Sequence, residues 1–325
     1  MEPGTRRLLV RIVAAILLAL APVVALSLSP WHAATGLLVL GILPTLTAVP
    51  SGRRAMLTAG AASTVIAALA VLASATGPLL PAVGTSIVVV LAFFTGSLSP
   101  RGLHPIGAAT ISFTAYVLVD PSLVLSVLDA VATVPAVAGL VAAAVLVTCA
   151  WVLLIARLLL RGVTLPVPAQ PATLPYGLLL AVLCGAFALV CLVWFRGTNA
   201  WWAVMTVALI LQPTGADTRE KLGGRIVGTV VGGTVAALVA GLLPGTAAAT
   251  LLGVAATLAS VFLLLGGTAY WLYTAAVTVS VVLLTFDADT ALAGDVQRVV
   301  ITLIAAAVTA AVTWAVSRLA PLPDD

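Results

Sequence analysis

Apolar runs follow one another along almost the whole chain, separated by short polar or proline- and glycine-containing breaks. Most runs have about the 17 to 25 residues that a helix needs to cross a bilayer, and they lack the alternation typical of membrane strands. The pattern therefore predicts an all-α integral membrane protein with about twelve transmembrane helices. Six are expected at 8–28, 33–49, 55–76, 81–98, 104–119 and 136–160. Six more are expected at 175–195, 199–213, 223–243, 246–265, 268–286 and 296–318, with an interfacial helix or a loop at 122–134.

The expected spans divide into a first half at 1–160 and a second at 174–325. Between them, 161–173 contains three prolines, which forbid a helix and indicate an extended cytoplasmic linker. Because each half has an even number of spans, the two would share one orientation, as parallel six-helix repeats. Residues that recur at offsets of 170, 169 and 168 are Trp31 and Trp201, Pro44 and Pro213, and Gly60 and Gly228.

Composition and charge agree with a membrane protein. Hydrophobic residues make up 62% of the 325 positions and charged residues 7%, against roughly 25% charged in soluble domains. With a cytoplasmic N-terminus, every lysine and arginine except Arg196 and Arg298 falls on the inner side, which is a strong positive-inside bias. We therefore expect a multi-pass protein of the bacterial cytoplasmic membrane with both termini cytoplasmic. Its first apolar run is expected to be a structural helix rather than a signal peptide.

The stretch 201–240 organises the second half. An apolar run ends at Gln212-Pro213, a polar and charged loop follows, and a long helix is expected to open on Arg225. Glycines recur along this helix at four-residue spacing: Gly224, Gly228 and Gly232. Such a face lets a neighbouring backbone approach closely, so it predicts helix packing, with a hinge or a bare backbone path as the alternative.

Polar residues in this stretch suggest an anion path. Pro213 frees a backbone carbonyl one turn back, and Gln212 brings donors to that point, so either a plain helix terminus or a lined vestibule is expected. Topology alone explains Arg219 and Lys221. Arg225 instead needs a partner, either Asp217 or Glu220 in the same stretch or a bound anion.

Constellations typical of enzymes are missing. The two histidines, His32 and His104, fall on opposite sides of the membrane, and the cysteines Cys149, Cys184 and Cys191 lie in apolar runs as packing residues. We expect no enzyme activity, no cofactor and no metal. Asp295 and Arg298, three residues apart, are expected to pair locally. The tryptophans that fit an outer aromatic belt, or a stacking surface for an aromatic substrate, are Trp31, Trp194, Trp201 and Trp202.

The second half resembles the fusaric acid resistance (FUSC) family, also called aromatic acid exporters. The resemblance is carried by Trp201-Trp202, Thr206, Gln212-Pro213, Thr218-Arg219 and the run from Arg225 to Gly232. It is clear over 175–245 and faint over 8–76. The larger exporters have a sizeable cytoplasmic domain where this chain has only 161–173. Leu57 stands where Arg225 would map in the first half. The family implies six-helix membrane units and efflux of aromatic or other organic acids.

These observations predict a transporter-like protein that exports small organic acid anions, aromatic ones among them. Arg225, with Arg219 and Lys221, would collect the anion at the cytoplasmic face. Gln212, Thr206 and Thr229 would line the path, while Pro213 and the glycine face would serve packing or a hinge. The expected partners are the lipid bilayer, small organic anions and a second copy of the chain in a homo-oligomer, without nucleic acid. The alternative is a membrane assembly or scaffold protein with no transport activity.

Overall fold

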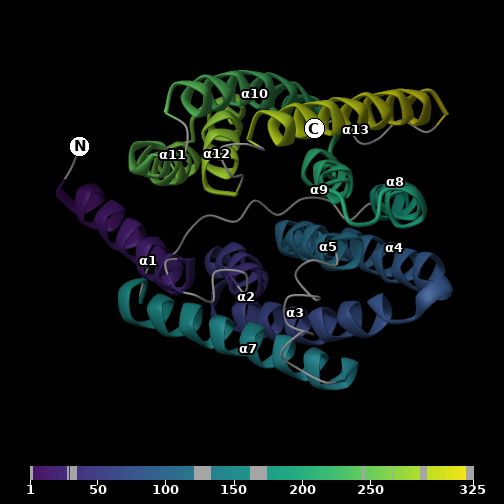
Figure 1. The fold of residues 1–325 in the computed structure, drawn as a ribbon, viewed down its shortest axis with the longest axis horizontal. Helices are drawn as coiled ribbons and strands as arrows, with labels where there is room; N and C mark the ends of the chain where they lie inside the picture. The colour runs from purple at the N-terminus through teal and green to yellow at the C-terminus, as the bar shows by residue number, and fades with distance from the viewer. Residues whose placement is uncertain are drawn as a thin grey trace. The chain divides into compact units, whose positions relative to one another are not determined.

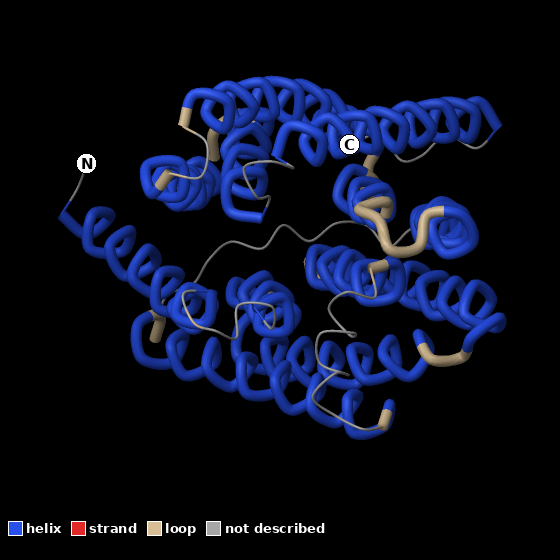
Figure 2. The backbone as a smooth tube through the Cα atoms, in the orientation of Figure 1, coloured by secondary structure: helices blue, strands red, loops and turns tan. Residues whose placement is uncertain are grey.

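The structure is a computed structural model that describes residues 3–27, 29, 35–120, 133–161, 174–243, 246–265, 267–285 and 291–319. These residues form α-helices joined by turns, with no strand among them (Figure 2). Eight helices come first, α1 (Pro3–Ser27), α2 (Thr35–Thr47), α3 (Gly52–Ser74), α4 (Leu80–Leu98), α5 (His104–Val119), α7 (Val134–Leu159), α8 (Leu174–Trp194) and α9 (Trp201–Ile210) (Figure 1). Four follow, α10 (Gly215–Leu242), α11 (Ala247–Leu265), α12 (Tyr270–Thr285) and α13 (Ala291–Leu319). The predicted all-α class is confirmed.

Most helix ends lie close to the predicted ones, because proline and glycine mark the breaks. The helix α5 has the predicted bounds. Short 3-10 turns at Val49–Ser51, Gly77–Leu79 and Ser99–Arg101 precede α3, α4 and α5, and each has proline as its second residue. Proline suits the first turn of a helix, since its fixed φ is already helical and its missing N–H has no partner to lose.

Six of the described helices are long and apolar enough to cross a membrane: Arg53–Ser74, Gly77–Arg101, Val134–Leu159, Leu174–Trp194, Gly215–Leu242 and Val296–Arg318. The chain is therefore a multi-pass helical membrane protein. The other described helices have apolar stretches that are shorter than those of these six. The shortest of these helices, α9, has 10 residues, so it covers about 15 Å of a hydrocarbon core about 30 Å thick. Twelve complete crossings stay a prediction.

The helices group into two compact units, Met1–Ala208 and Leu209–Asp325. In the first unit α3 packs along α7, and α4 packs along α8 (Figure 1). Small residues permit both contacts. A Cβ on Gly96 of α4 would lie 2.6 Å from the Cα of Gly177 in α8, and one on Gly60 of α3 would lie 3.1 Å from the Cβ of Cys149 in α7. Glycine at these points brings the helix axes together.

In the second unit α10 packs along α12 over most of its length, and α11 and α13 flank this pair. Under the predicted repeat, α3, α4, α5 and α7 correspond to α10, α11, α12 and α13. In the first half α3 contacts α5 and α7, and α4 contacts α5. The corresponding contacts of α10 with α12 and α13, and of α11 with α12, are present in the second half. The repeat arrangement itself stays a prediction, as does the division at 161–173. Of that linker only Arg161 is described, and the rest lies outside the described residues. Three other sequence predictions fall outside them as well, namely those for Trp31, His32 and 121–132.

Candidate functional site

The turn between α9 and α10 is closed by Gln212. Pro213 has no N–H with which to bond the carbonyl of Leu209, four residues back. The Gln212 side-chain amide supplies that donor instead, since its Nε2 lies 3.1 Å from the Leu209 carbonyl oxygen and 2.9 Å from that of Leu211. Gln212 is 5% exposed. Its amide nitrogen therefore satisfies the end of α9, which is the plainer of the two roles that the sequence leaves open.

Thr214 and Thr218 start α10. The Thr214 hydroxyl accepts a hydrogen bond from the backbone N–H of Asp217 at 3.2 Å, which is a typical N-cap. The Thr218 hydroxyl accepts from the backbone N–H of Gln212 at 3.0 Å and lies 2.9 Å from the Thr214 carbonyl. Asp217 also places a negative charge in the first turn, where the helix dipole favours it. These contacts fix the position at which α10 leaves the turn.

The sequence interpretation of 214–222 as a loop, and of a helix that opens on Arg225, is wrong. The helix α10 begins at Gly215, because the Thr214 cap precedes the charged residues and carries them on the first two turns. Arg225 thus lies ten residues into the helix, about 15 Å from its start along the axis. Its side chain is buried, with 3% of its surface exposed.

Arg225 has no hydrogen-bond or ion-pair partner among the described residues. No hydrogen bond or ion pair joins it to Asp217 or Glu220, the two acids that the sequence offers, and its Nε is buried without an acceptor. On membrane-insertion scales an arginine near a helix centre costs about 2.5–3.5 kcal/mol, so burial of this kind calls for compensation. Its charge does reach the phenol of Tyr273 on α12.

Two threonine hydroxyls near this arginine are also buried and unbonded within the described residues: Thr229 on α10 and Thr274 on α12. Thr229 lies one turn beyond Arg225 on the same helix face, about 6 Å along the axis. Thr274 lies opposite Gly228, where an added Cβ would stand 2.6 Å from the threonine Cβ. The seam between α10 and α12 therefore gathers a guanidinium and free hydroxyls without a carboxylate bonded to them.

The other two predicted cations lie in different surroundings. Lys221, one turn before Arg225, is half-buried, and its Nζ lies 5.6 Å from the ring centre of Tyr270 on α12. Arg219 is exposed and points to another side of α10. The structure thus aligns Lys221 with Arg225 along one helix face and leaves Arg219 apart from them.

Three of the glycines on α10, Gly224, Gly228 and Gly232, lie directly against α12. A Cβ added to Gly224 would stand 2.7 Å from Cδ1 of Tyr270, and one on Gly232 would stand 2.8 Å from the Cβ of Thr278. At Gly228 it would collide with the carbonyl oxygen of Trp271. The two helices therefore touch backbone to backbone over two turns. This contact uses the glycines for packing, and the hinge role stays a prediction.

Thr206 and the tryptophan pair belong to the first unit, whereas Arg225 belongs to the second. Thr206 lies on α9 with no surface exposed, and its hydroxyl has no partner among the described residues. Trp201 stacks on Trp202 with ring centres 4.3 Å apart, and Tyr116 of α5 lies 4.8 Å from Trp201. Trp202 is buried, whereas an interfacial belt would leave it partly exposed.

Sequence reasoning missed the burial of Arg298. The sequence places it at the outer surface beside Asp295, but its side chain is only 1% exposed. Its guanidinium donates to the Thr278 carbonyl at 3.3 Å and to the Thr278 hydroxyl at 3.4 Å, so it ties α13 to α12. An arginine two turns inside an apolar helix is a signal for such a tertiary partner, although the sequence does not say which residue it is.

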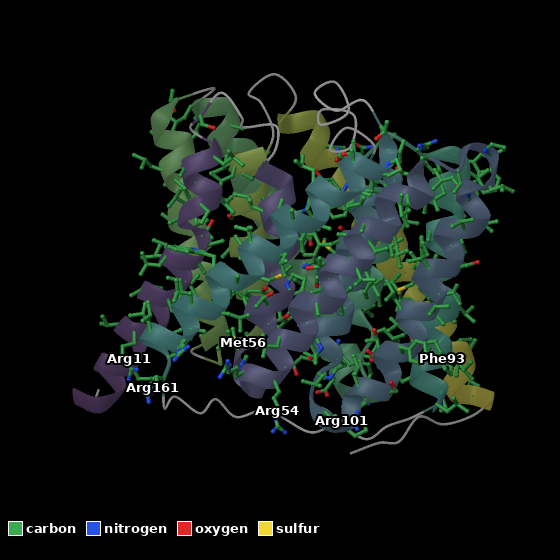
Figure 3. All side chains as sticks on the ribbon, turned by 90° about the horizontal axis from the view of Figure 1, so that it is seen from below. Arg11, Arg54, Met56, Phe93, Arg101 and Arg161 are labelled. Atoms are coloured by element: carbon green, nitrogen blue, oxygen red, sulfur yellow. The ribbon has the colours of Figure 1, made fainter. Side chains whose placement is uncertain are left out.

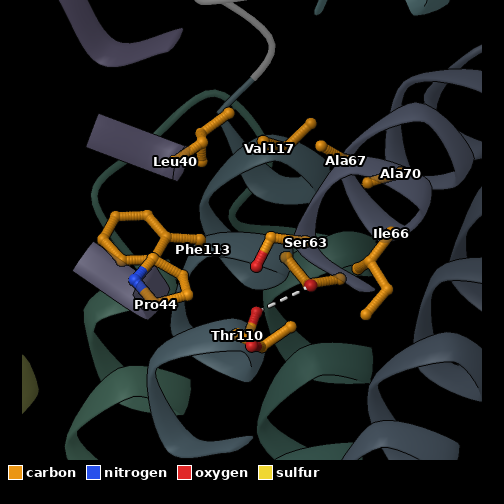
Figure 4. Close-up of a pocket in the computed structure, with 10 residues that line it drawn as sticks. Leu40, Pro44, Ser63, Ile66, Ala67, Ala70, Thr110, Phe113 and Val117 are labelled. Atoms are coloured by element: carbon orange, nitrogen blue, oxygen red, sulfur yellow. Dashed lines mark hydrogen bonds between the residues drawn. The ribbon is translucent and has the colours of Figure 1, made fainter. Parts of the chain in front are cut away.

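A small pocket in the first unit offers no room for a ligand. It lies between α2, α3 and α5, and Figure 4 shows Ser63 and Thr110 facing it among apolar side chains. The volume is about 10 Å³, which holds at most one water molecule. Within the described residues no group of histidine, cysteine or acidic side chains is arranged to hold a metal ion.

The long apolar helices define a class of protein, a multi-pass helical membrane protein. Residues 183–312, from α8 into α13, match the family described as fusaric acid resistance protein-like. This match confirms the resemblance seen in the sequence and extends it to the C-terminal side of 175–245. No curated protein and no solved structure matches the chain.

Proposed function

We propose that this protein exports small organic acid anions, aromatic acids among them, across the bacterial cytoplasmic membrane. The observation that carries the proposal is Arg225, a residue only 3% exposed, to which no acidic side chain bonds among the described residues. A carboxylate is the natural partner of a planar guanidinium, because two parallel N–H groups match its two oxygens. The fusaric acid resistance-like match over 183–312 supports the same substrate class.

The remaining residues take roles according to their burial. Lys221, half-buried one turn before Arg225, would draw the anion from the cytoplasmic side, and exposed Arg219 would contribute only to the local field. Thr229 would donate a second hydrogen bond beside Arg225, and we add Thr274 from α12 to this set. Gln212, whose amide nitrogen bonds the Leu209 carbonyl, would act by closing the turn that precedes α10. Thr206 would line the path in the first unit.

The test replaces Arg225 with glutamine and uses Arg219→Gln as the matched control, since it removes the same charge from the same helix at an exposed position. Excreted acids are first compared between cells with and without the protein, and efflux of labelled benzoate is then followed as a simple aromatic probe. Loss of a charge-assisted hydrogen bond weakens binding by about 1.5–3 kcal/mol, so Arg225→Gln should slow efflux roughly tenfold or more. Arg219→Gln should stay within about twofold.

Stability separates transport from a structural role for Arg225. Because the buried charge has no bonded partner, its removal should leave the melting temperature unchanged or raise it. Under the scaffold alternative, which the closely packed glycine face of α10 favours, Arg225→Gln would lower the amount of assembled protein or change nothing. Efflux per folded molecule that is equal in wild type and Arg225→Gln would refute the proposal.

A further inference from the structure

A groove in the first unit combines arginines with apolar walls. It lies between the start of α3 and the end of α7, next to the 3-10 turn Val49–Ser51, and its volume is about 660 Å³. Ligand sites in proteins commonly measure roughly 300–1,000 Å³. Every residue that lines it belongs to the same compact unit. The groove is therefore large enough for the head and the first methylene groups of an amphiphilic ligand.

Three arginines stand on the rim: Arg53 on α3, Arg157 on α7 and Arg161 just after it. All three are exposed. The sequence from 3 to 119 and from 133 to 208 contains neither aspartate nor glutamate. No carboxylate is among the described residues that line the groove, so an anion is the complementary ligand.

Arg11 holds this rim in place. Its Nε lies 2.7 Å from the Leu159 carbonyl oxygen, and its Nη2 lies 3.1 Å from that of Arg161. These bonds satisfy the end of α7, where helix carbonyls lack internal partners. Figure 3 shows Arg11 close to Arg161 at one end of the unit, with Arg54 and Arg101 farther along the same end. Arg11 therefore acts through Arg161 rather than as a further ligand.

The walls of the groove include apolar side chains, and two of them, Leu57 and Leu154, are accessible. Met56 and Leu57 come from α3, and Leu154 comes from α7. Leu57 is 47% exposed and Leu154 46% exposed, on helices long and apolar enough to span a bilayer. A positive-inside bias accounts for arginines at this end of the helices, but it does not require them to surround a hollow with hydrophobic sides. A ligand that fits has a negative head and a hydrocarbon body.

We propose that this groove binds one anionic phospholipid of the surrounding bilayer, with its phosphate among Arg53, Arg157 and Arg161 and its acyl chain along Leu57 and Leu154. Arginine binds phosphate oxygens through two parallel N–H groups, and basic pockets between membrane helices at the cytoplasmic side suit anionic head groups. The site uses none of the residues of the anion path around Arg225. Lipid binding is therefore expected to persist in Arg225→Gln.

The experiment compares the full-length protein in nanodiscs and in mild detergent with dioleoylphosphatidylglycerol or dioleoylphosphatidylcholine. Melting temperature and lipid retained in native mass spectrometry are measured for wild type and for the double variant Arg53→Gln/Arg157→Gln. The matched control is Arg54→Gln/Arg101→Gln, which removes the same charge at exposed positions outside the groove. Wild type and the control should retain phosphatidylglycerol in preference to phosphatidylcholine, and the groove variant should retain roughly tenfold less.

Three results would overturn the proposal. One is equal retention of the two lipids by wild type, and another is equal loss in the groove variant and the control. The third is stabilisation by inorganic phosphate or benzoate as strong as that by phosphatidylglycerol, which would assign the groove to free anions. Because the groove variant lies on the surface, it should keep the wild-type melting temperature in phosphatidylcholine.

Discussion

An alanine at Gly228 tests how closely α10 and α12 pack. The added Cβ would stand 2.6 Å from the Cβ of Thr274 and 2.9 Å from the backbone nitrogen of Ala275, and it would collide with the Trp271 carbonyl oxygen. A carbon and a carbonyl oxygen normally approach to about 3.3 Å. The helices must therefore separate locally, and such overpacking costs about 1–3 kcal/mol. Alanine also gains about 1 kcal/mol of helix propensity over glycine, which masks part of the loss.

The matched control is Gly223→Ala on the same helix, where an added Cβ meets nothing within 4 Å. Both variants gain the same helix propensity, so the difference between them isolates the packing term of about 1–3 kcal/mol. A shift of roughly 2–4 °C per kcal/mol predicts that Gly228→Ala melts about 2–12 °C below Gly223→Ala in detergent. If the two variants melt at the same temperature, α10 and α12 do not pack backbone to backbone as described.

Two further results are expected. Gln212→Leu removes the donor that bonds the Leu209 carbonyl, which Pro213 leaves without its helical partner. A buried unbonded carbonyl costs about 1–3 kcal/mol, so the variant should melt several degrees lower. An unchanged melting temperature would contradict this capping role. The three free cysteines are buried, with exposed fractions of 2% for Cys149, 0% for Cys184 and 2% for Cys191. N-ethylmaleimide should therefore label none of them in the folded protein and all of them in dodecyl sulfate. Rapid labelling of the folded protein would contradict their burial.

The sequence predicts the helices well because the bilayer imposes their length and composition. Proline and glycine then mark the breaks, and α5 shows the predicted bounds at 104–119. The error at the start of α10 has a local cause. Charged residues after Pro213 resemble a loop, but the Thr214 cap and Asp217 satisfy the first turn of a helix that begins before the apolar run does. Polarity marks the membrane boundary, and a cap marks the helix boundary.

The candidate site is predictable only in part. The sequence identifies Arg225 as a cation in an apolar helix, and it offers Asp217 or Glu220 as partners. Only the fold decides that neither acid bonds to it, since both lie in the first two turns while Arg225 is buried on the third. Thr274 and Arg298 are also tertiary findings, because their neighbours come from other helices. Periodicity gives the face of a residue, not the helix that covers it.

The arginines of the groove rim and Arg225 are of two physical kinds, and the difference bears on function. Those on the groove rim are exposed, where charge is screened and several arginines together are needed to hold an anion. Arg225 is buried, where one uncompensated charge acts strongly over a few ångströms. Leu57, which the predicted repeat aligns with Arg225, is apolar and lines the groove. The two halves thus differ at the position where an anion would bind, so a repeat in fold would not be a repeat in chemistry. A transport path built on Arg225 therefore needs the second half, and the first half is free to bind lipid.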